Sequence, residues 1–449
     1  MDTLPPELLE HVFAFLSISD RLCFSRTSYY MYLNSWASLY SDVTFYADPY
    51  SANLTLGSAS LLAQLYSQSD IRGKACNRMR LVRTLAVEPD RQPYFWATPN
   101  AYRTLNMVFL QLLKHKSIQC GLRTFRWSMG FSAGLERCHL PLPSHLTVLK
   151  CVASQVEATA VFPSLKKLAV YRMIDINGKW VARQLRCSKL THLALSGTST
   201  SGNVSMACCF QVENTHLKQL EHLQLEHVHI DMWPFSSETR LSHLSLRFCT
   251  EDVGLYQACT ASLSHLESFI LVSEHELHDV VAFETFLASC EKLKSLALLL
   301  AGRTSAIPLS WIRPRYLTLQ TLVLEARFSH LTPALEYRYP ATDMSKALAE
   351  MPHIRVLGVS MDLDVSHALV CTHRARSLQT RLTCNCSTPA FQKAASSYCI
   401  YVIGSTLSSL CHVLNGRQRS SPREEIPRSI MPRSFWMTAS VIMFQAPPT

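Results

Sequence analysis

The residues of this chain best suited to chemistry are histidines, because an imidazole titrates near neutral pH and can bind metals. Three of them occupy the same position in similar segments: Thr-His-Leu at His192, Glu-His-Leu at His222 and Ser-His-Leu at His243. If these segments lie side by side, the three rings form a polar, pH-responsive patch. A histidine tolerated on an exposed strand gives the same pattern, so the sequence leaves both interpretations open.

The metal-binding and catalytic motifs of the sequence are incomplete. His275 and His278 stand three residues apart, whereas the zinc protease helix needs its second histidine at i+4. Cys384 and Cys386 lack the Cys-x-x-Cys spacing of a structural zinc site. No phosphate-binding glycine loop, dinucleotide-binding turn or nucleophile elbow occurs. We therefore expect no metal, no cofactor and no catalytic residue, and the chain is not predicted to be an enzyme.

A recurring pattern, apolar-x-x-Leu-x-x-Leu-x-Leu, indicates which elements carry the three histidines. Its Leu-x-Leu end predicts a short strand whose inward leucines stack on the next copy. The segments between copies read as helices, with Asp279 and Asp343 as expected N-caps of two of them. The second apolar position of the pattern occurs eleven times, at Val82, Leu122, Leu146, Leu165, Leu190, Leu220, Leu241, Leu266, Leu293, Leu319 and Ile354.

Most gaps between these positions fall in or near roughly 20–29 residues, the period of leucine-rich repeats. The pattern predicts an α/β fold, a degenerate solenoid of short parallel strands with helices on its convex side. In such a solenoid the side chains between the inward leucines line the concave face, where ligands usually bind. The predicted target-binding residues on that face are His192, His222, Gln224, Glu226, His243 and Arg247.

The N-terminal segment predicts three short helices. Residues 4–16 form an apolar helix entered through Pro6, and Ser17 or Ser19 can cap a second helix near Asp20. A third apolar segment runs over residues 29–39. Three helices in about 40 residues bury too little surface to be stable alone, so the module must pack on a neighbour or a partner.

The order of residues in this segment resembles an F-box over residues 2–45: Leu4-Pro5-Pro6-Glu7, an apolar helix ending at Leu16, Ser19-Asp20-Arg21-Leu22 and a Phe-Ser-Arg-Thr-Ser run. The tryptophan of the third helix, Trp36, stands slightly later than in the family. The resemblance implies docking on a Skp-family adaptor and, through it, on a cullin. It assigns the adaptor contact to Leu4, Pro5, Leu8, Val12, Leu16 and Leu22.

The repeats behind this segment extend the resemblance, since Cys187 and Cys290 each open a copy as in the cysteine-containing repeats found behind F-boxes. The chain thus resembles an F-box protein with C-terminal leucine-rich repeats of the fungal type. That implies a substrate-recognition subunit of an SCF-type ubiquitin ligase whose concave face binds an unknown target protein. The alternative is a ligase-independent interaction scaffold with a helical N-terminal cap. The predicted domains are the F-box at 1–45, a linker or first cap segment at 46–78, the solenoid at 79–370 and a basic, poorly ordered tail at 371–449.

The composition bears on which classes of partner the chain can bind. The chain has 449 residues, of which 48% are hydrophobic, and this excludes wholesale disorder. Its net charge is +10, but nine Lys/Arg against two Glu beyond residue 370 supply +7 of it. The remainder therefore lacks the basic groove that a nucleic acid needs. With no run of 18 apolar residues and no secretion signal, we expect neither a membrane nor a nucleic-acid partner, and a cytoplasmic or nuclear location.

Overall fold

The chain divides into two units, Met1–Gly404 and Ser405–Thr449. In the computed structural model all described residues belong to the first unit and none lies beyond residue 362, so the predicted tail at 371–449 lies outside them. The fold is mixed α/β, which confirms the predicted class. The described residues are 5–48, 51, 53–66, 69–71, 74–76, 78–90, 99–129, 139–198, 204–211, 216–251, 254–275, 277–303, 305–327, 336–359 and 361–362.

Three helices open the chain: α1 (Pro6–Phe15), α2 (Ile18–Ser25) and α3 (Tyr29–Tyr40). A proline in the first turn of α1 costs no hydrogen bond, because that N–H would have no helical partner. Of the two serines expected to cap α2, Ser17 does so by accepting a hydrogen bond from the N–H of Asp20. The hydroxyl of Ser28 caps α3 in the same way.

These helices share a small core of their own, formed by Leu9, Phe13 and Met31, all at most 2% exposed. The ring of Phe24 meets that of Phe13 edge to face, with centroids 5.7 Å apart. The guanidinium of Arg21 donates hydrogen bonds to the carbonyls of Leu16 and Ser38, and so ties the end of α1 to α3.

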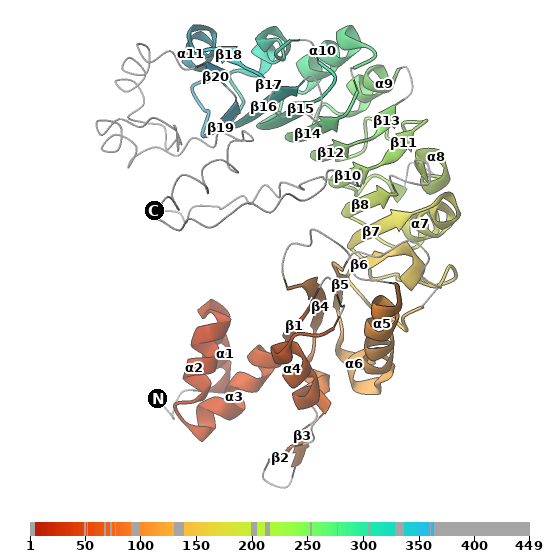
Figure 1. Ribbon diagram of the computed structural model, residues 1–449, viewed down its shortest axis with the longest axis vertical. Helices are drawn as coiled ribbons and strands as arrows, with labels where there is room; N and C mark the ends of the chain where they lie inside the picture. Colours follow the sequence, from red (N-terminus) through yellow and green to blue (C-terminus); the bar gives the residue numbers. More distant parts are fainter. Residues whose placement is uncertain are drawn as a thin grey trace, which may run out of the picture. The chain divides into compact units, whose positions relative to one another are not determined.

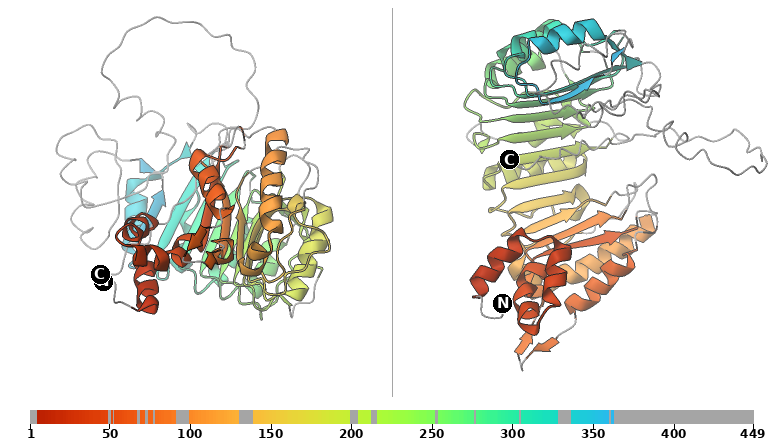
Figure 2. Two further views of the ribbon diagram at one scale, coloured as in Figure 1. Left: turned by 90° about the horizontal axis from the view of Figure 1, so that it is seen from below. Right: turned by 90° about the vertical axis from the view of Figure 1, so that its left-hand side faces the viewer.

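A sheet of thirteen strands dominates the described residues (Figures 1 and 2), and its strands follow the chain in order. Twelve of them are parallel, while β17 pairs antiparallel with β16. The strands are β1 (Asp42–Ala47), β4 (Thr84–Pro89), β5 (Thr124–Trp127), β6 (Val148–Val152), β7 (Lys167–Met173), β8 (His192–Gly197), β10 (His222–Glu226), β12 (His243–Arg247), β14 (Ser268–Ser273), β15 (Ser295–Leu300), β16 (Thr321–Arg327), β17 (Glu336–Tyr337) and β19 (Val356–Val359).

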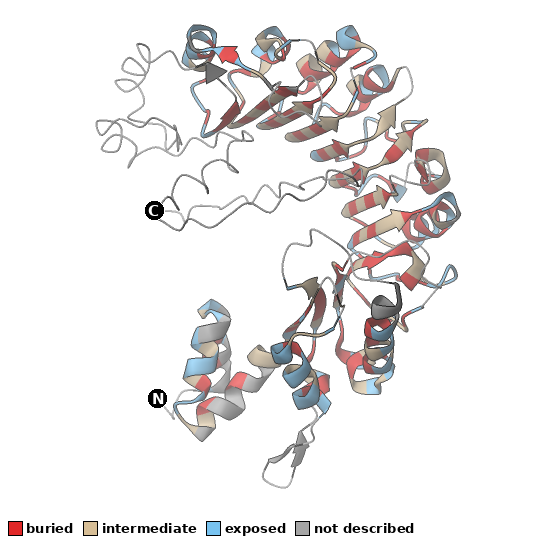
Figure 3. Ribbon diagram, in the orientation of Figure 1, coloured by how far each residue is buried: buried red, intermediate tan, exposed pale blue. Residues whose placement is uncertain are grey.

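The repeat pattern correctly predicts where these parallel strands begin. All eleven predicted apolar positions are buried, from Val82 to Ile354, and a strand starts two residues after each. Figure 3 shows the resulting alternation of buried and accessible residues along the strands. The inward leucines of successive strands pair in register, Leu193 with Leu223 and Leu223 with Leu244, and form one continuous core.

One strand precedes those predicted. β1 pairs with β4 along its whole length, Asp42 opposite Thr84, so the sheet begins well before residue 79. The position that a leucine would occupy holds Tyr40, the last residue of α3, which packs against the large core. The segment expected to be a linker or first cap segment, 46–78, contains the end of β1 and helix α4 (Leu56–Tyr66).

The remaining helices lie along one side of the large sheet (Figure 1), as the alternation of strand and helix requires. No helix among the described residues is long and apolar enough to cross a membrane. These helices are α5 (Pro99–Lys114), α6 (Lys116–Gly121), α7 (Asp175–Cys187), α8 (Met206–Cys209), α9 (Leu255–Ser262), α10 (Val280–Ser289) and α11 (Ala341–Ala349), with single turns at η1 (Arg78–Leu81), η2 (Ala153–Gln155), η4 (Leu309–Trp311) and η5 (Arg313–Arg315).

Short strands complete the described structure. In the middle repeats the chain turns from β10 and β12 through His227 and Phe248, both left-handed with φ of 51° and 52°. The two rings stack with centroids 5.2 Å apart. This turn leads into a second parallel ladder of three strands, β9 (Val204–Ser205), β11 (Val228–Ile230) and β13 (Thr250–Glu251); the other pairs are β2 (Ser69–Ile71) with β3 (Lys74–Cys76) and β18 (Tyr339–Pro340) with β20 (Met361–Asp362).

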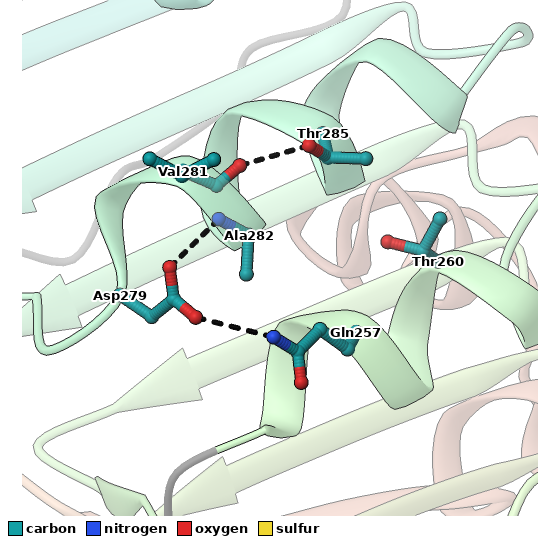
Figure 4. Close-up of a pocket in the computed structure, with 6 residues that line it drawn as sticks. All are labelled: Gln257, Thr260, Asp279, Val281, Ala282 and Thr285. Atoms are coloured by element: carbon teal, nitrogen blue, oxygen red, sulfur yellow. Dashed lines mark hydrogen bonds between the residues drawn. The ribbon is translucent and has the colours of Figure 1, made fainter.

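Asp279 caps α10 as predicted: its carboxylate accepts a hydrogen bond from the N–H of Ala282 at 2.9 Å (Figure 4). Asp343 does not cap α11, because that helix starts earlier, with Pro340 at the N-cap and Asp343 inside the first turn.

We expect Asp279→Ala to lower the free energy of unfolding by about 1–2 kcal/mol. Asp343→Ala, the matched control, should cost only about 0.5 kcal/mol. Urea unfolding measures both, and equal losses would contradict the assignment of the caps.

Candidate adaptor and target interfaces

The three histidines expected to share a repeat position do lie in one row. Register pairs His192 with His222 and His222 with His243, across β8, β10 and β12. The first two rings stack with centroids 3.9 Å apart and planes 14° apart, and the second pair is stacked at 4.0 Å and 21°. The row continues into Lys167 on one side and Ser268 on the other.

We refer to the stacked rings of His192, His222 and His243 as the histidine column. Protonation of the column is unfavourable. Burial, together with the neighbouring imidazoles of His243 and His192 and the charge of Lys167, lowers the pKa of His222 to about 4. Burial also lowers the pKa of His192 and of His243. The outer rings bond to hydroxyls, with 2.8 Å from Thr191 Oγ1 to Nδ1 of His192 and from Ser242 Oγ to Nδ1 of His243. At neutral pH the column is therefore uncharged.

The other three predicted target-binding residues belong to the same surface. Gln224 stands between Ala194 and Ser245 in the next row, and Glu226 pairs in register with Arg247. All three side chains are partly exposed. The Nε of Arg247 donates a hydrogen bond to Ser245 Oγ at 3.3 Å. The sheet thus brings all six predicted residues onto three neighbouring strands.

Acid should destabilise this part of the sheet. Because the pKa of His222 is lowered on folding, the unfolded chain binds protons more readily between about pH 6.5 and pH 4, so stability falls as pH falls through that window. We expect wild type to lose about 1 kcal/mol more than His222→Gln between pH 7 and pH 5, after allowing for screening by water at a partly exposed ring. Urea unfolding at the two pH values measures this. His353→Gln is the control and should follow wild type, and equal losses in wild type and His222→Gln would contradict the expectation.

The described residues contain no group of three or more His, Cys, Asp or Glu that could hold a metal ion. Cys384 and Cys386 lie outside the described residues. The pocket between α9 and α10, about 310 Å³ in volume, contains one carboxylate, Asp279, which is already engaged as a helix cap (Figure 4).

The first helix presents a second surface. Leu8, Val12 and Phe15 follow one another at helical spacing on α1 and are 50%, 40% and 90% exposed. Leu22 on α2 is 44% exposed. Large apolar side chains gathered on an exposed face mark a site of protein interaction.

The segment that carries this apolar surface of α1 resembles a known family. Residues 1–32 match the family model of the F-box domain. The match covers α1 and α2 and ends within α3. An F-box domain indicates a substrate-adaptor role in SCF-type ubiquitin ligases, and F-box proteins are generally non-catalytic receptors that bind Skp-family adaptors. A search of curated proteins finds no match to the chain.

The predicted adaptor contacts on the F-box segment divide by exposure. Pro5, Leu8, Val12 and Leu22 are exposed, Leu16 is partly buried, and Leu4 lies outside the described residues. Phe15, which is 90% exposed on α1, is not among the contacts that the sequence predicted. The sequence feature that groups Phe15 with Leu8 is their i+7 spacing. This spacing places Phe15 on the stripe of Val12 rather than on the stripe of Leu9 and Phe13.

Proposed function

We propose that this protein is the substrate-recognition subunit of an SCF-type, cullin-based ubiquitin ligase. The observation that carries the proposal is the F-box match at residues 1–32 together with the exposed stripe of Leu8, Val12 and Phe15 within it. That stripe docks on a Skp-family adaptor, which joins the chain to a cullin. The protein then works in the cytoplasm or the nucleus, where such ligases and their targets meet.

The parallel strands of residues 79–370 act as leucine-rich repeats that hold a target protein. The supporting observation is the single row of accessible positions on the sheet, which brings His192, His222 and His243 together with polar neighbours. The chain itself does no chemistry. It raises the effective concentration of target lysines near the ubiquitin-conjugating enzyme.

Reconstitution tests the proposal. The full chain is co-expressed with a Skp-family adaptor and a cullin, and size-exclusion chromatography measures whether the three co-elute. A stoichiometric complex is expected. A folded, monodisperse chain that never associates with the adaptor would overturn the ligase role.

The alternative is a scaffold in which the helices only cap the array. It is favoured by one observation, that Tyr40 at the end of α3 packs against the large core and Ser41 accepts hydrogen bonds from the N–H groups of Arg83 and Thr84. Under this alternative, truncating Leu8 and Phe15 would leave every interaction of the chain unchanged, because neither side chain is buried by the array.

A further inference from the structure

The face of the large sheet that carries the histidine column becomes apolar toward its C-terminal strands. Register aligns Ile270 with Ala297 and Ala297 with Val323, while Val272 lies opposite Leu299 in a row that ends at Glu325. The five apolar side chains are only partly buried, and they come from three adjacent strands, β14, β15 and β16. We refer to them as the apolar patch. A contiguous apolar surface of this kind favours the burial of a partner's apolar side chains.

Toward its N-terminal strands the same face is cationic. Arg126 on β5 pairs in register with Lys150 on β6, and Lys167 follows on β7. These three residues form the cationic patch, and all three side chains are accessible. In the part of the chain that is described, no ion pair engages them; the ammonium of Lys150 lies 5.2 Å over the ring of Tyr171.

Charge within the cationic patch is incompletely balanced. Burial lowers the pKa of Lys150, the carboxylate of Glu88 raises it, and the charge of Arg126 lowers it again. At Lys150 the positive charge of Arg126 therefore opposes the one carboxylate, Glu88, that acts on its ammonium. An anionic partner would relieve this imbalance, and it would gain more than at a fully exposed site, because Lys150 is partly withdrawn from water.

We propose that this face binds an extended target segment that contains both acidic and large apolar residues. The two kinds of residue are six to nine positions apart, in either order. The acidic part lies on the cationic patch, the apolar part lies on the apolar patch, and the intervening residues cross the histidine column. The proposal rests on the proposed function in assigning target binding to the repeats.

The spacing follows from sheet geometry. Four inter-strand steps separate Lys167 on β7 from Ile270 on β14, and six separate Lys150 on β6 from Leu299 on β15. At about 4.8 Å a step these are distances of about 19 and 29 Å, which an extended chain rising about 3.3 Å per residue crosses in about six to nine residues. A nucleic acid fits less well, since its phosphates have no use for the apolar patch.

Peptide display tests the proposal without knowledge of the natural target. The full chain, alone and bound to a Skp-family adaptor, selects from random 16-residue peptides on phage. We expect the enriched peptides to combine Asp or Glu with Leu, Ile, Val or Phe at the stated separation. The most enriched peptide is then synthesised, and fluorescence anisotropy measures its Kd.

Two variants and their matched controls locate the binding. Lys150→Glu/Lys167→Glu and Leu299→Ser/Val323→Ser should each weaken binding of that peptide at least about tenfold, which is about 1.4 kcal/mol. Lys179→Glu/Lys346→Glu on helices α7 and α11, and Val281→Ser on α10, carry similar changes on exposed helix positions and should stay within about twofold of wild type.

The inference would be overturned by no enrichment, by enriched peptides lacking either half of the pattern, by unaffected binding in either face variant, or by equal competition from single-stranded RNA. Self-association of wild type that disappears in Leu299→Ser/Val323→Ser would assign the apolar patch to a second copy, and would overturn it too. Adaptor binding is scored separately in the same preparations. A chain that binds adaptor but no such peptide retains the proposed function, whereas a chain that binds the peptide but no adaptor retains only this inference.

Discussion

A Leu8→Ser/Phe15→Ser variant is expected to lose at least about a hundredfold in affinity for a Skp-family adaptor, which corresponds to about 2.7 kcal/mol. The two side chains are 50% and 90% exposed in the free chain, so docking can bury most of their apolar surface. Burying a large apolar side chain contributes about 1.5–3 kcal/mol. Isothermal titration calorimetry with the purified adaptor measures the loss.

The same variant should keep its stability, and this separates docking from folding. Exposed substitutions usually change the free energy of unfolding by less than about 0.5 kcal/mol. Leu9→Ser/Phe13→Ser is the matched control. It makes the same two changes on α1, but at side chains that are fully buried. It should unfold the helical module, detected by circular dichroism and by limited proteolysis. Wild-type adaptor affinity in Leu8→Ser/Phe15→Ser would exclude this stripe as the docking surface.

The strands of the large sheet were predictable because packing imposes their pattern. The apolar residue two positions before each of eleven strands must be buried for the next repeat to stack, so its spacing is visible in the chain from Val82 to Ile354. β1 escaped prediction because Tyr40 takes the leucine's place and ends a helix. A tyrosine satisfies the packing there, since it reaches the core while Arg78 covers its ring at 5.5 Å.

Which side chains share a row was predictable from the sequence, whereas their geometry was less so. Repeat position alone placed His192, His222 and His243 in one row, whereas their stacking and lowered pKa values depend on burial by neighbouring strands. On α1 the sequence shows one apolar face, but the structure divides it into the buried stripe of Leu9 and Phe13 and the exposed stripe that includes Phe15. Which of two adjacent stripes is buried depends on α2 and α3, and helical periodicity does not contain that information.

Gly197→Ala is expected to lower the free energy of unfolding by at least about 3 kcal/mol. A Cβ on Gly197 would lie 2.2 Å from the carbonyl oxygen of His227, well inside van der Waals contact. His227 cannot easily move away, because it is held left-handed at φ 51° and its N–H donates to the carbonyl of Arg247. Urea unfolding of the full chain measures the change.

Gly57→Ala is the control for the loss of glycine itself. It lies in α4 with no atom near its would-be Cβ, so alanine should stabilise the helix by about 0.5 kcal/mol. A double substitution, Gly197→Ala with His227→Gly, distinguishes a local clash from a general loss of packing. Glycine at 227 frees the left-handed backbone to shift, and it should recover part of the loss because the clash involves a main-chain atom. A Gly197→Ala protein as stable as wild type would show that β8 and β10 separate at this end without cost, and the turn into the second ladder would then not depend on their close contact.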